Sequence, residues 1–564
     1  MRAPESRIYS VAVPTRTWLF ASVGVLVLTM AVAALGDPSV NSGSDAGGKL
    51  ATVVEMSGSG LDGGSIGYWA ESADPTGRFH PLVNTQRTDR GWIQATSSVM
   101  PLASSVGYRV AGSFGALWLS FLAVPLGALA AAALSRQMGA ASGWLAFAVI
   151  GVASPLAFYG ADQWEHGLAI AATLWALVLL RGAKSRPQVL ALGVLVGLCV
   201  VLRREVVFVL LASGVVELLN PSRRQWWRGK WLSGAAALGL STVLFGVVGQ
   251  LDHRVLGQGL ASRSASQISG AGTDLGQRAT DTILTTVAQY PGRATSHMVL
   301  AAVTLLGVAV AAAGQRNRAT RYVVLGLSMT AFGTAMRIFV GGLGFVPGAF
   351  AVLPLTAAAP MVVRRVNQPA LWAVGVATAL TVAFQWTGSL SSQWGGRYLL
   401  VPAAVIAIAT VTEFERAGWR QPVAAVALAA TVAIAGMGLV WHVQRTSSIG
   451  ESRDEILALT SGEVVVSTHA HMPREIAVSL RSQRWLRADT LDDLADVMSV
   501  VALAAPGERV WLLHPGTCAQ EPCGRTWAER GDGQLASGWH SGEVHEVSWL
   551  DGGTYVVEAF TPSH

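Results

Sequence analysis

Long apolar runs separated by short, arginine-bearing loops constrain this chain more than any other feature. Clear examples are residues 110–134, 231–248 and 423–440. At a rise of about 1.5 Å per residue, helices of this length cross most or all of a hydrocarbon core about 30 Å thick. Because lipid offers the backbone no hydrogen-bond partner, each run is predicted to be an α-helix. The chain is therefore predicted to be a multi-pass membrane protein.

The composition agrees with a membrane protein. Hydrophobic residues make up 51% of the chain and charged residues only 13%, whereas soluble proteins have roughly 25% charged residues. The net charge is +6, but the basic residues are dispersed and nearly all are arginine. This pattern favours anchors on cytoplasmic loops over a nucleic-acid surface. The expected surroundings are membrane lipid, and no nucleic-acid partner is expected.

The distribution of arginine predicts the topology. Arg2, Arg7 and Arg16 precede the first run, at 19–35, so the N-terminus is expected in the cytoplasm. This run exceeds the roughly 7–15 apolar residues of a signal peptide, which favours a retained helix over a cleaved signal. Alternation from there gives about thirteen spans in the plasma (inner) membrane and an extracytoplasmic C-terminus. The later runs are 110–134, 142–160, 166–181, 188–202, 205–219, 231–249, 297–313, 321–341, 347–363, 369–386, 398–412 and 423–441.

The predicted fold class is mainly α, a polytopic membrane helical bundle with a C-terminal extracytoplasmic α/β domain. The membrane-embedded region is expected over residues 1–445, with an outer loop at 37–108, and the α/β domain over 446–564. In this tail, apolar segments of strand and helix type alternate. Strands are expected at 463–467, 509–513, 544–547 and 554–560, and helices at 473–481 and 491–503.

The chain has three cysteines. Cys199 lies within an apolar run and is most simply a small packing residue. Cys518 and Cys523 lie in the predicted outer domain, where an oxidising compartment favours a disulfide between them. A zinc pair is the weaker interpretation, because no second pair of ligands has suitable spacing.

The first outer loop contains Asp62 in the segment Gly-Ser-Gly-Leu-Asp-Gly-Gly-Ser at 58–65. An aspartate among glycines is often a plain turn residue. The functional alternative is a carboxylate at the outer membrane face that acts as general base on an acceptor hydroxyl. The two interpretations stay open on the residues alone.

A second polar segment, 154–167, ends one apolar run and contains Asp162, Glu165 and His166 beside Tyr159 and Trp164. An interfacial aromatic belt explains the two aromatic residues. It explains the three ionisable side chains less well, which makes Glu165 and His166 candidates for substrate binding. Since both loops are predicted on one face, Asp62 is expected close to Glu165 and His166.

Arginines that depart from the loop pattern form a third group. Arg203 and Arg204 are followed by Glu205 between two runs, on the predicted outer side, and Arg337 lies near the outer end of its run. Arg203 and Arg204 are either a snorkelling pair partly neutralised by Glu205 or a clamp for an anion such as phosphate. A charge such as that of Arg337 inside the membrane is costly and often functional.

A fourth segment, 393–402, begins a membrane run at the predicted outer face. It contains Trp394, Arg397 and Tyr398 around two glycines. An interfacial anchor accounts for these residue types. Glycines beside an arginine also allow the backbone to approach an anion closely.

The order and placement of these segments resemble the polytopic C-type (GT-C) glycosyltransferases, most of all a bacterial branch common in actinobacteria. The resemblance covers roughly residues 15–445 and is carried by 154–166, 193–205 and 394–402. It implies transfer of a sugar from a polyprenyl-phosphate donor to a cell-envelope glycan, lipid or protein acceptor at the outer membrane face.

The resemblance also implies roles for particular residues. Asp62 is the nearest match to the family's acidic residue in the first outer loop, although Gly63 stands where a second acidic residue is usual. Arg203, Arg204 and Arg397 would face the donor phosphate. Many members use a divalent cation, but no ligand set for one stands out in the sequence.

Two other function classes compete with an enzyme. One is a transporter or flippase of an envelope precursor, for which internal repeats and interrupted helices near the midplane are typical; no convincing repeat is present. The other is a non-catalytic envelope-assembly protein in which the soluble tail is the working part. Clustering of the polar residues at one predicted face favours the enzyme.

Overall fold

The computed structural model describes residues 16–41, 44–82, 85–94, 96–219, 224–225, 231–257, 275–276, 279, 295–341, 348–363, 368–384, 397–417, 422–469, 472–489, 491–517, 538–549 and 553–563. The chain divides into two compact units. The helical unit comprises Met1–Met30, Ser120–Gly249 and Ser264–Leu439, and the mixed unit comprises Ala31–Leu119, Gln250–Arg263 and Val440–His564. The mixed unit therefore combines the loop predicted at 37–108 with the C-terminal tail.

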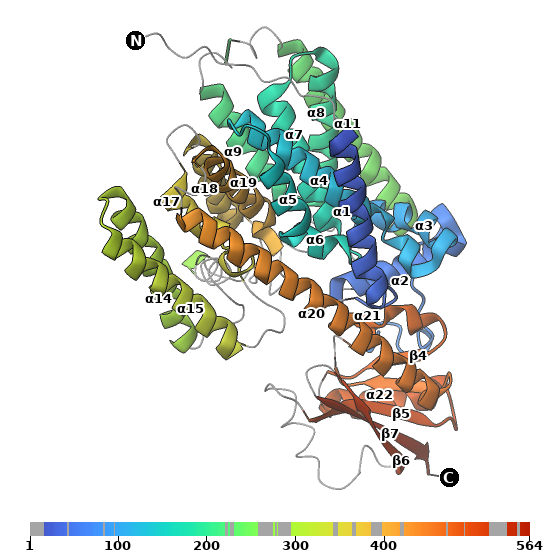
Figure 1. The fold of residues 1–564 in the computed structure, drawn as a ribbon. Coiled ribbons are helices and arrows are strands. Elements are labelled where there is room, and N and C mark those ends of the chain that lie inside the picture. The colour runs from blue at the N-terminus through green and yellow to red at the C-terminus, as the bar shows by residue number, and fades with distance from the viewer. Residues whose placement is uncertain are drawn as a thin grey trace, which may run out of the picture. The chain divides into compact units, whose positions relative to one another are not determined.

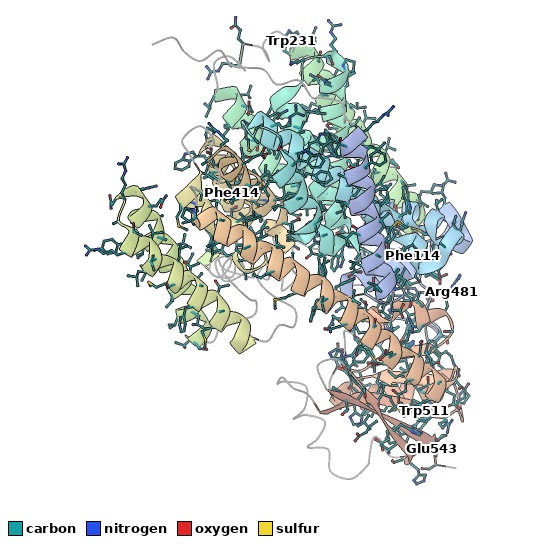
Figure 2. The ribbon with its side chains drawn as sticks, in the orientation of Figure 1. Phe114, Trp231, Phe414, Arg481, Trp511 and Glu543 are labelled. Atoms are coloured by element: carbon teal, nitrogen blue, oxygen red, sulfur yellow. The ribbon has the colours of Figure 1, made fainter. Side chains whose placement is uncertain are left out.

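The helical unit is built from helices of very different length (Figure 1). Its elements are α1 (Arg16–Leu35), α4 (Trp118–Gln137), α5 (Trp144–Val152), α6 (Pro155–Gly160), α7 (Glu165–Gly182), α8 (Arg186–Leu202), α9 (Val206–Leu219), α11 (Trp231–Leu256), α14 (Thr295–Arg316), α15 (Thr320–Gly341), α16 (Ala349–Val352), α17 (Leu355–Val362), α18 (Gln368–Phe384), η2 (Arg397–Leu399), α19 (Leu400–Ala417) and the first part of α20 (Pro422–Thr460). Figure 2 shows the labelled Trp231 at the start of α11 and Phe414 on α19.

Apolar helices confirm the expectation of a multi-pass membrane protein. Among the described residues, five helices are long and apolar enough to cross a membrane: α1, α4, α11, α20 and residues 298–316 of α14. α8, α9 and residues 369–384 of α18 are apolar but shorter. Large apolar side chains such as Phe20 on α1 and Trp372 on α18 are 73% and 71% exposed, as expected of surfaces that face lipid. The count of thirteen spans stays a prediction.

Several predicted spans have different boundaries because glycine and proline interrupt them. The run at 142–160 divides into α5 and α6 where Pro155 follows Ser154, and the run at 347–363 divides into α16 and α17 at Pro354. A proline lacks the N–H needed inside a helix and restricts the residue before it. The run at 110–134 begins as a span only at Trp118, since Gly112 at φ +58° distorts the preceding helix.

The mixed unit contains a five-stranded sheet in the order β4-β3-β5-β7-β6. β3 is parallel to β4 and β5, whereas β7 is antiparallel to β5 and β6. The elements are α2 (Ser44–Ser59), η1 (Gly60–Asp62), β1 (Thr85–Thr88), β2 (Gly91–Gln94), α3 (Val99–Ala116), the end of α20, β3 (Val464–Ser467), α21 (Met472–Glu475), η4 (Ala477–Arg481), β4 (Arg484–Arg487), α22 (Leu491–Ala504), β5 (Val510–Thr517), β6 (Trp539–Ser548) and β7 (Thr554–Pro562).

The tail shows the expected alternation of strands and helices, with three differences. The helix expected at 473–481 divides into α21 and the 3-10 helix η4. β4 was not expected, because four residues with two arginines give no clear strand pattern. α20 continues to Thr460 instead of ending near residue 441. Both faces of the sheet are covered, as alternating side chains require: Val464 and Val466 pack with α22 on one face, and Val465 packs with Met472 of α21 on the other.

The 37–108 loop forms part of the same core. Tyr68, Phe79 and Trp92 pack in one cluster with the sheet and α22, and the indole of Trp69 donates to the carbonyl of Trp485 at 3.0 Å. Gly77 has φ +66°, and a Cβ at this position would come within 1.9 Å of the Trp92 ring. The domain boundary predicted between residues 445 and 446 therefore does not separate two cores, because the 37–108 loop and the C-terminal tail contribute to the same hydrophobic core.

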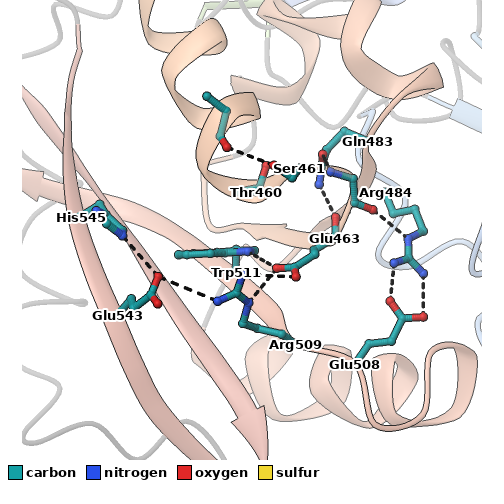
Figure 3. A network of polar contacts seen from close by, with 12 residues as sticks. Thr460, Ser461, Glu463, Gln483, Arg484, Glu508, Arg509, Trp511, Glu543 and His545 are labelled. Atoms are coloured by element: carbon teal, nitrogen blue, oxygen red, sulfur yellow. Dashed lines mark hydrogen bonds and ion pairs between the residues drawn. The ribbon is translucent and has the colours of Figure 1, made fainter.

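Polar contacts join the amino ends of β3, β4 and β5 (Figure 3). Glu463 accepts hydrogen bonds from Arg509 Nε at 2.8 Å and Trp511 Nε1 at 2.5 Å. Glu508 pairs with Arg484, and this pairing lowers the pKa of the Glu508 carboxyl. These contacts tie the loops before adjacent strands together.

A buried polar cluster stabilises the conformation of the 37–108 loop. His80 is 2% exposed; its Nε2 lies 3.3 Å from the carbonyl of Gly67, and its Nδ1 accepts from the Leu82 N–H at 3.1 Å. These partners require a neutral ring with the proton on Nε2. Burial lowers the pKa of His80 to about 4. Burial tends to raise the pKa of Asp74, but hydrogen bonds from Phe79 N–H, Tyr68 and Thr76 outweigh it and lower the pKa.

Acidification is therefore expected to destabilise the mixed unit in two steps. Between pH 6.5 and 4, His80 binds a proton in the unfolded chain but not in the folded one. The free energy of unfolding therefore decreases as the pH is lowered through this range. At pH 4.5 the loss is about 2–3 kcal/mol. Below the ordinary pKa of Asp74, 3.8, protonation of its carboxylate removes a further contribution. The measurement is thermal unfolding with limited proteolysis of the full chain at pH 7 and pH 4.5.

The control is His80→Gln, which retains one donor and one acceptor but does not titrate. This variant should show a much smaller loss between pH 6.5 and 4. An unchanged pH profile would mean that His80 does not control stability in this range.

Candidate functional site

The candidate site begins with the helix break at Ser154. The Ser154 hydroxyl accepts the Leu156 N–H at 3.1 Å and caps α6, with Pro155 in its first turn. Gly160 ends α6 in close contact with α4, because a Cβ there would lie 2.3 Å from the Val124 side chain. The break and the close approach place the following segment, 161–167, inside the helical unit.

Three aromatic rings form a buried wall in this segment. His166 stacks on Tyr159 with ring centroids 5.0 Å apart and meets Trp164 edge-on at 4.8 Å. Asp162 is buried beside them and accepts the backbone N–H of Gln163 at 2.7 Å. Because all of these side chains are buried, the segment is more than the interfacial belt that the aromatic residues alone would indicate.

A buried cluster of charges adjoins this wall. Arg203 ends α8 in an extended conformation, with φ −149° and ψ 107°, and is 7% exposed. Its Nε donates to Glu205 at 2.5 Å, and its NH1 donates to Glu165, in the first turn of α7, at 3.3 Å. One guanidinium thus joins two carboxylates that come from the starts of two helices.

Tyr398 closes the cluster on another side. It lies in η2, just before α19, and the Arg203 guanidinium carbon is 4.9 Å from the centre of its ring. A pocket is lined by His166, Arg203, Glu205, Thr381 and Tyr398 together with apolar residues of α7, α9 and α19. Its cavity volume is ≈ 10 Å³, about enough for one water molecule. A larger ligand therefore requires the lining side chains to move apart.

The structure thus brings together four of the predicted site residues: Glu165, His166, Arg203 and Tyr398. Arg204 is half-buried in the turn between α8 and α9. Arg203 does not snorkel toward water, because two carboxylates hold it in the interior. Glu205 is therefore a full member of the cluster, and Thr381 of α18 joins the pocket without any sequence signal, since a threonine in an apolar run is common.

The other predicted site residues are described only in part. The structure describes the backbone but not the side chains of Asp62 in η1, Arg337 in α15 and Arg397 in η2. Trp394, Cys518 and Cys523 lie outside the described residues. The proximity of Asp62 to Glu165 and His166 stays a prediction, and so does the disulfide.

The divalent cation that the family resemblance implies would need a set of protein ligands. In the part of the chain that the structure describes, no three His, Cys, Asp or Glu side chains gather in a way that could hold a metal ion. The carboxylates of Glu165 and Glu205 contact the Arg203 guanidinium instead.

Fold and site together describe a helical membrane protein with a buried ionic cluster and a mixed α/β unit. No protein-family model and no curated protein sequence matches the chain. Solved structures to which the chain is similar include two of ArnT from Cupriavidus metallidurans. The form bound to undecaprenyl phosphate is 14% identical, covers 97% of this chain and 98% of its own, and has a TM-score of 0.41. The apo form is 14% identical, covers 96% and 98%, and has a TM-score of 0.38.

Proposed function

We propose that this chain is a membrane glycosyltransferase that moves a sugar from a polyprenyl-phosphate donor to a cell-envelope acceptor at the outer membrane face. The observation that carries the proposal is the buried Glu165–Arg203–Glu205 cluster against Tyr398, at the ends of apolar helices. Buried charges in such a place are costly and are usually functional. Undecaprenyl phosphate, the ligand in one of the ArnT structures, is a polyprenyl phosphate, the part of such a donor that leaves when the sugar is transferred.

The proposed reaction needs an anion site and a base. The acceptor hydroxyl oxygen forms a bond to the anomeric carbon of the donor, and the bond from that carbon to the phosphate oxygen breaks. The electron pair leaves with the lipid phosphate, and the hydroxyl proton passes to a carboxylate. We assign the base to Asp62 and the stabilisation of the leaving phosphate to Arg204 and Arg397, because arginine matches phosphate oxygens in two contacts.

Arg203 has a different part in this proposal. Its guanidinium is held by Glu165 and Glu205, so it fixes these two carboxylates and presents only its remaining surface to a ligand. Of the wall formed by His166, Tyr159 and Trp164, the His166 ring lines the pocket beside the polar cluster, and the other two rings pack behind it. Rings of this kind bind the apolar faces of ligands while the charged groups orient them.

The direct test is a transfer assay with purified chain, radiolabelled polyprenyl-phosphate sugars and cell-envelope acceptor fractions, with and without a divalent cation. We expect label to leave the lipid fraction and to appear covalently in the acceptor. Membranes without the chain and a sugar phosphate without the lipid serve as controls. Label that crosses the bilayer while still attached to its lipid would instead identify a transporter.

Arg397→Ala is expected to weaken donor binding. Loss of one charge-assisted contact of this kind costs about 1.5–3 kcal/mol, which corresponds to a rise in the KM for donor of roughly tenfold to a hundredfold. Kinetics at varied donor concentration measure the change. Arg321→Ala, an exposed arginine of α15, is the matched control and should leave the KM unchanged. A folded Arg397→Ala variant with normal donor KM would exclude Arg397 from this role.

A further inference from the structure

A second pocket lies between helices at the opposite end of α7 from Glu165. Leu134 of α4, Arg181 of α7, Glu217 of α9 and Ala373 of α18 contribute to its lining. Its cavity volume is ≈ 170 Å³, several times the roughly 30 Å³ that one water occupies in the liquid. Eight of the eleven lining side chains are apolar, and the polar ones are Arg181, Ser213 and Glu217.

The polar groups of this pocket stand on two neighbouring helices. Arg181 Nε lies 3.5 Å from a carboxylate oxygen of Glu217, and both side chains are partly exposed, at 27% and 15%. Ser213 lies one helical turn before Glu217 on α9 and also lines the pocket. The pocket thus has an apolar body with a charged group that an incoming ligand can reach.

Basic residues gather at the same end of the helical unit. Gln137, at the end of α4, donates to the carbonyl of Val178 near the end of α7 at 3.0 Å. The end of α19 adjoins the loop after α4, where Glu415 accepts the Ser142 N–H at 2.6 Å. The last turns of α4, α7 and α19 carry arginines at 136, 181 and 416. Cations favour helix C-termini in any protein, and of these three arginines Arg181 also lines the pocket.

The pocket adjoins surfaces that face lipid. Pro369 at the start of α18 is exposed and lines it, and Trp372 and Val376, which follow on the same helix, are 71% and 50% exposed. On α9, Val215 and Leu219 are also largely exposed. An acyl chain in the surrounding bilayer therefore lies next to the pocket without crossing a polar surface.

We infer that this pocket binds one anionic phospholipid, with an acyl chain in the apolar body and the phosphate near Arg181. The inference goes beyond the proposed transfer reaction. The charge complementarity between the basic helix ends and a phosphodiester selects this lipid over a zwitterionic one, since basic pockets between membrane helices are suited to anionic head groups. Arg181 is placed to exchange part of its contact with Glu217 for the phosphate oxygens.

Native mass spectrometry of the purified full chain tests this inference by adding phosphatidylglycerol or phosphatidylcholine. Wild type is expected to retain one phosphatidylglycerol, about tenfold more tightly than phosphatidylcholine. Ala373→Phe fills the cavity and should abolish retention, while Val376→Phe adds the same ring to the exposed side of α18 and should not. Equal retention of the two lipids by wild type, or full retention by Ala373→Phe, would overturn the inference.

A second variant covers the case in which Ala373→Phe fails to fold. Arg181→Gln with Glu217→Gln removes both charges together, so neither is left unpaired. This variant should keep the cavity but lose about tenfold in its preference for phosphatidylglycerol. Free glycerol phosphate, added as a third probe, should not be retained, because it lacks the acyl chain. An unchanged preference in the double variant would contradict a phosphate site at Arg181.

Discussion

Asp62→Asn is expected to reduce sugar transfer by about 10²–10⁴-fold, because loss of a general base typically has an effect of this size. Asparagine keeps the shape of the side chain but accepts no proton. Asp62 ends the short helix η1, followed by Gly63 in an extended conformation, so the change should leave the backbone intact. The measurement is kcat in the transfer assay, with yield and melting temperature recorded alongside.

Asp496→Asn is the matched control for this prediction. Asp496 lies in the same mixed unit, is 57% exposed and pairs with Arg78 at the surface, where ion pairs contribute little. It should retain normal transfer. If Asp62→Asn also transfers at a normal rate, Asp62 is a turn residue, and Glu165 becomes the leading candidate for the base.

Arg203→Met is expected to destabilise the helical unit by about 3–5 kcal/mol, because removing one partner of a buried ion pair leaves uncompensated charge in the interior. Here two carboxylates, Glu165 and Glu205, lose their shared partner. A sharp fall in folded yield and melting temperature of the purified protein would show this. Arg78→Met, which breaks exposed ion pairs, should leave the folded yield and the melting temperature nearly unchanged, because surface ion pairs contribute little.

A triple variant separates the structural part of Arg203 from its part in function. Replacing Glu165 with Leu, Arg203 with Met and Glu205 with Leu removes every charge of the cluster, and apolar replacements of this kind often restore stability. We expect a folded protein without transfer activity. A triple variant that folds and transfers sugar normally would show that the cluster has no functional role.

The sequence by itself determined the membrane character of this chain and the segments where polar residues flank its apolar runs. Apolar runs of spanning length leave no alternative to a helix, because the backbone must satisfy its own hydrogen bonds in lipid. The polar segment at 154–167 and the Arg203–Glu205 segment also stood out, since charges at such positions depart from the pattern around them. Local composition is sufficient for conclusions of this kind.

Only the tertiary structure decided which of these segments meet. Glu165 and Arg203 are 38 residues apart, and their contact depends on how α7 and α8 pack. Tyr398 reaches the same guanidinium from almost two hundred residues further along the chain. The 37–108 loop packs against the C-terminal sheet through Tyr68, Phe79 and Trp92, although more than three hundred residues separate the loop from the sheet. Side-chain periodicity specifies which face of an element is apolar, but the partner of that face is selected by packing in three dimensions.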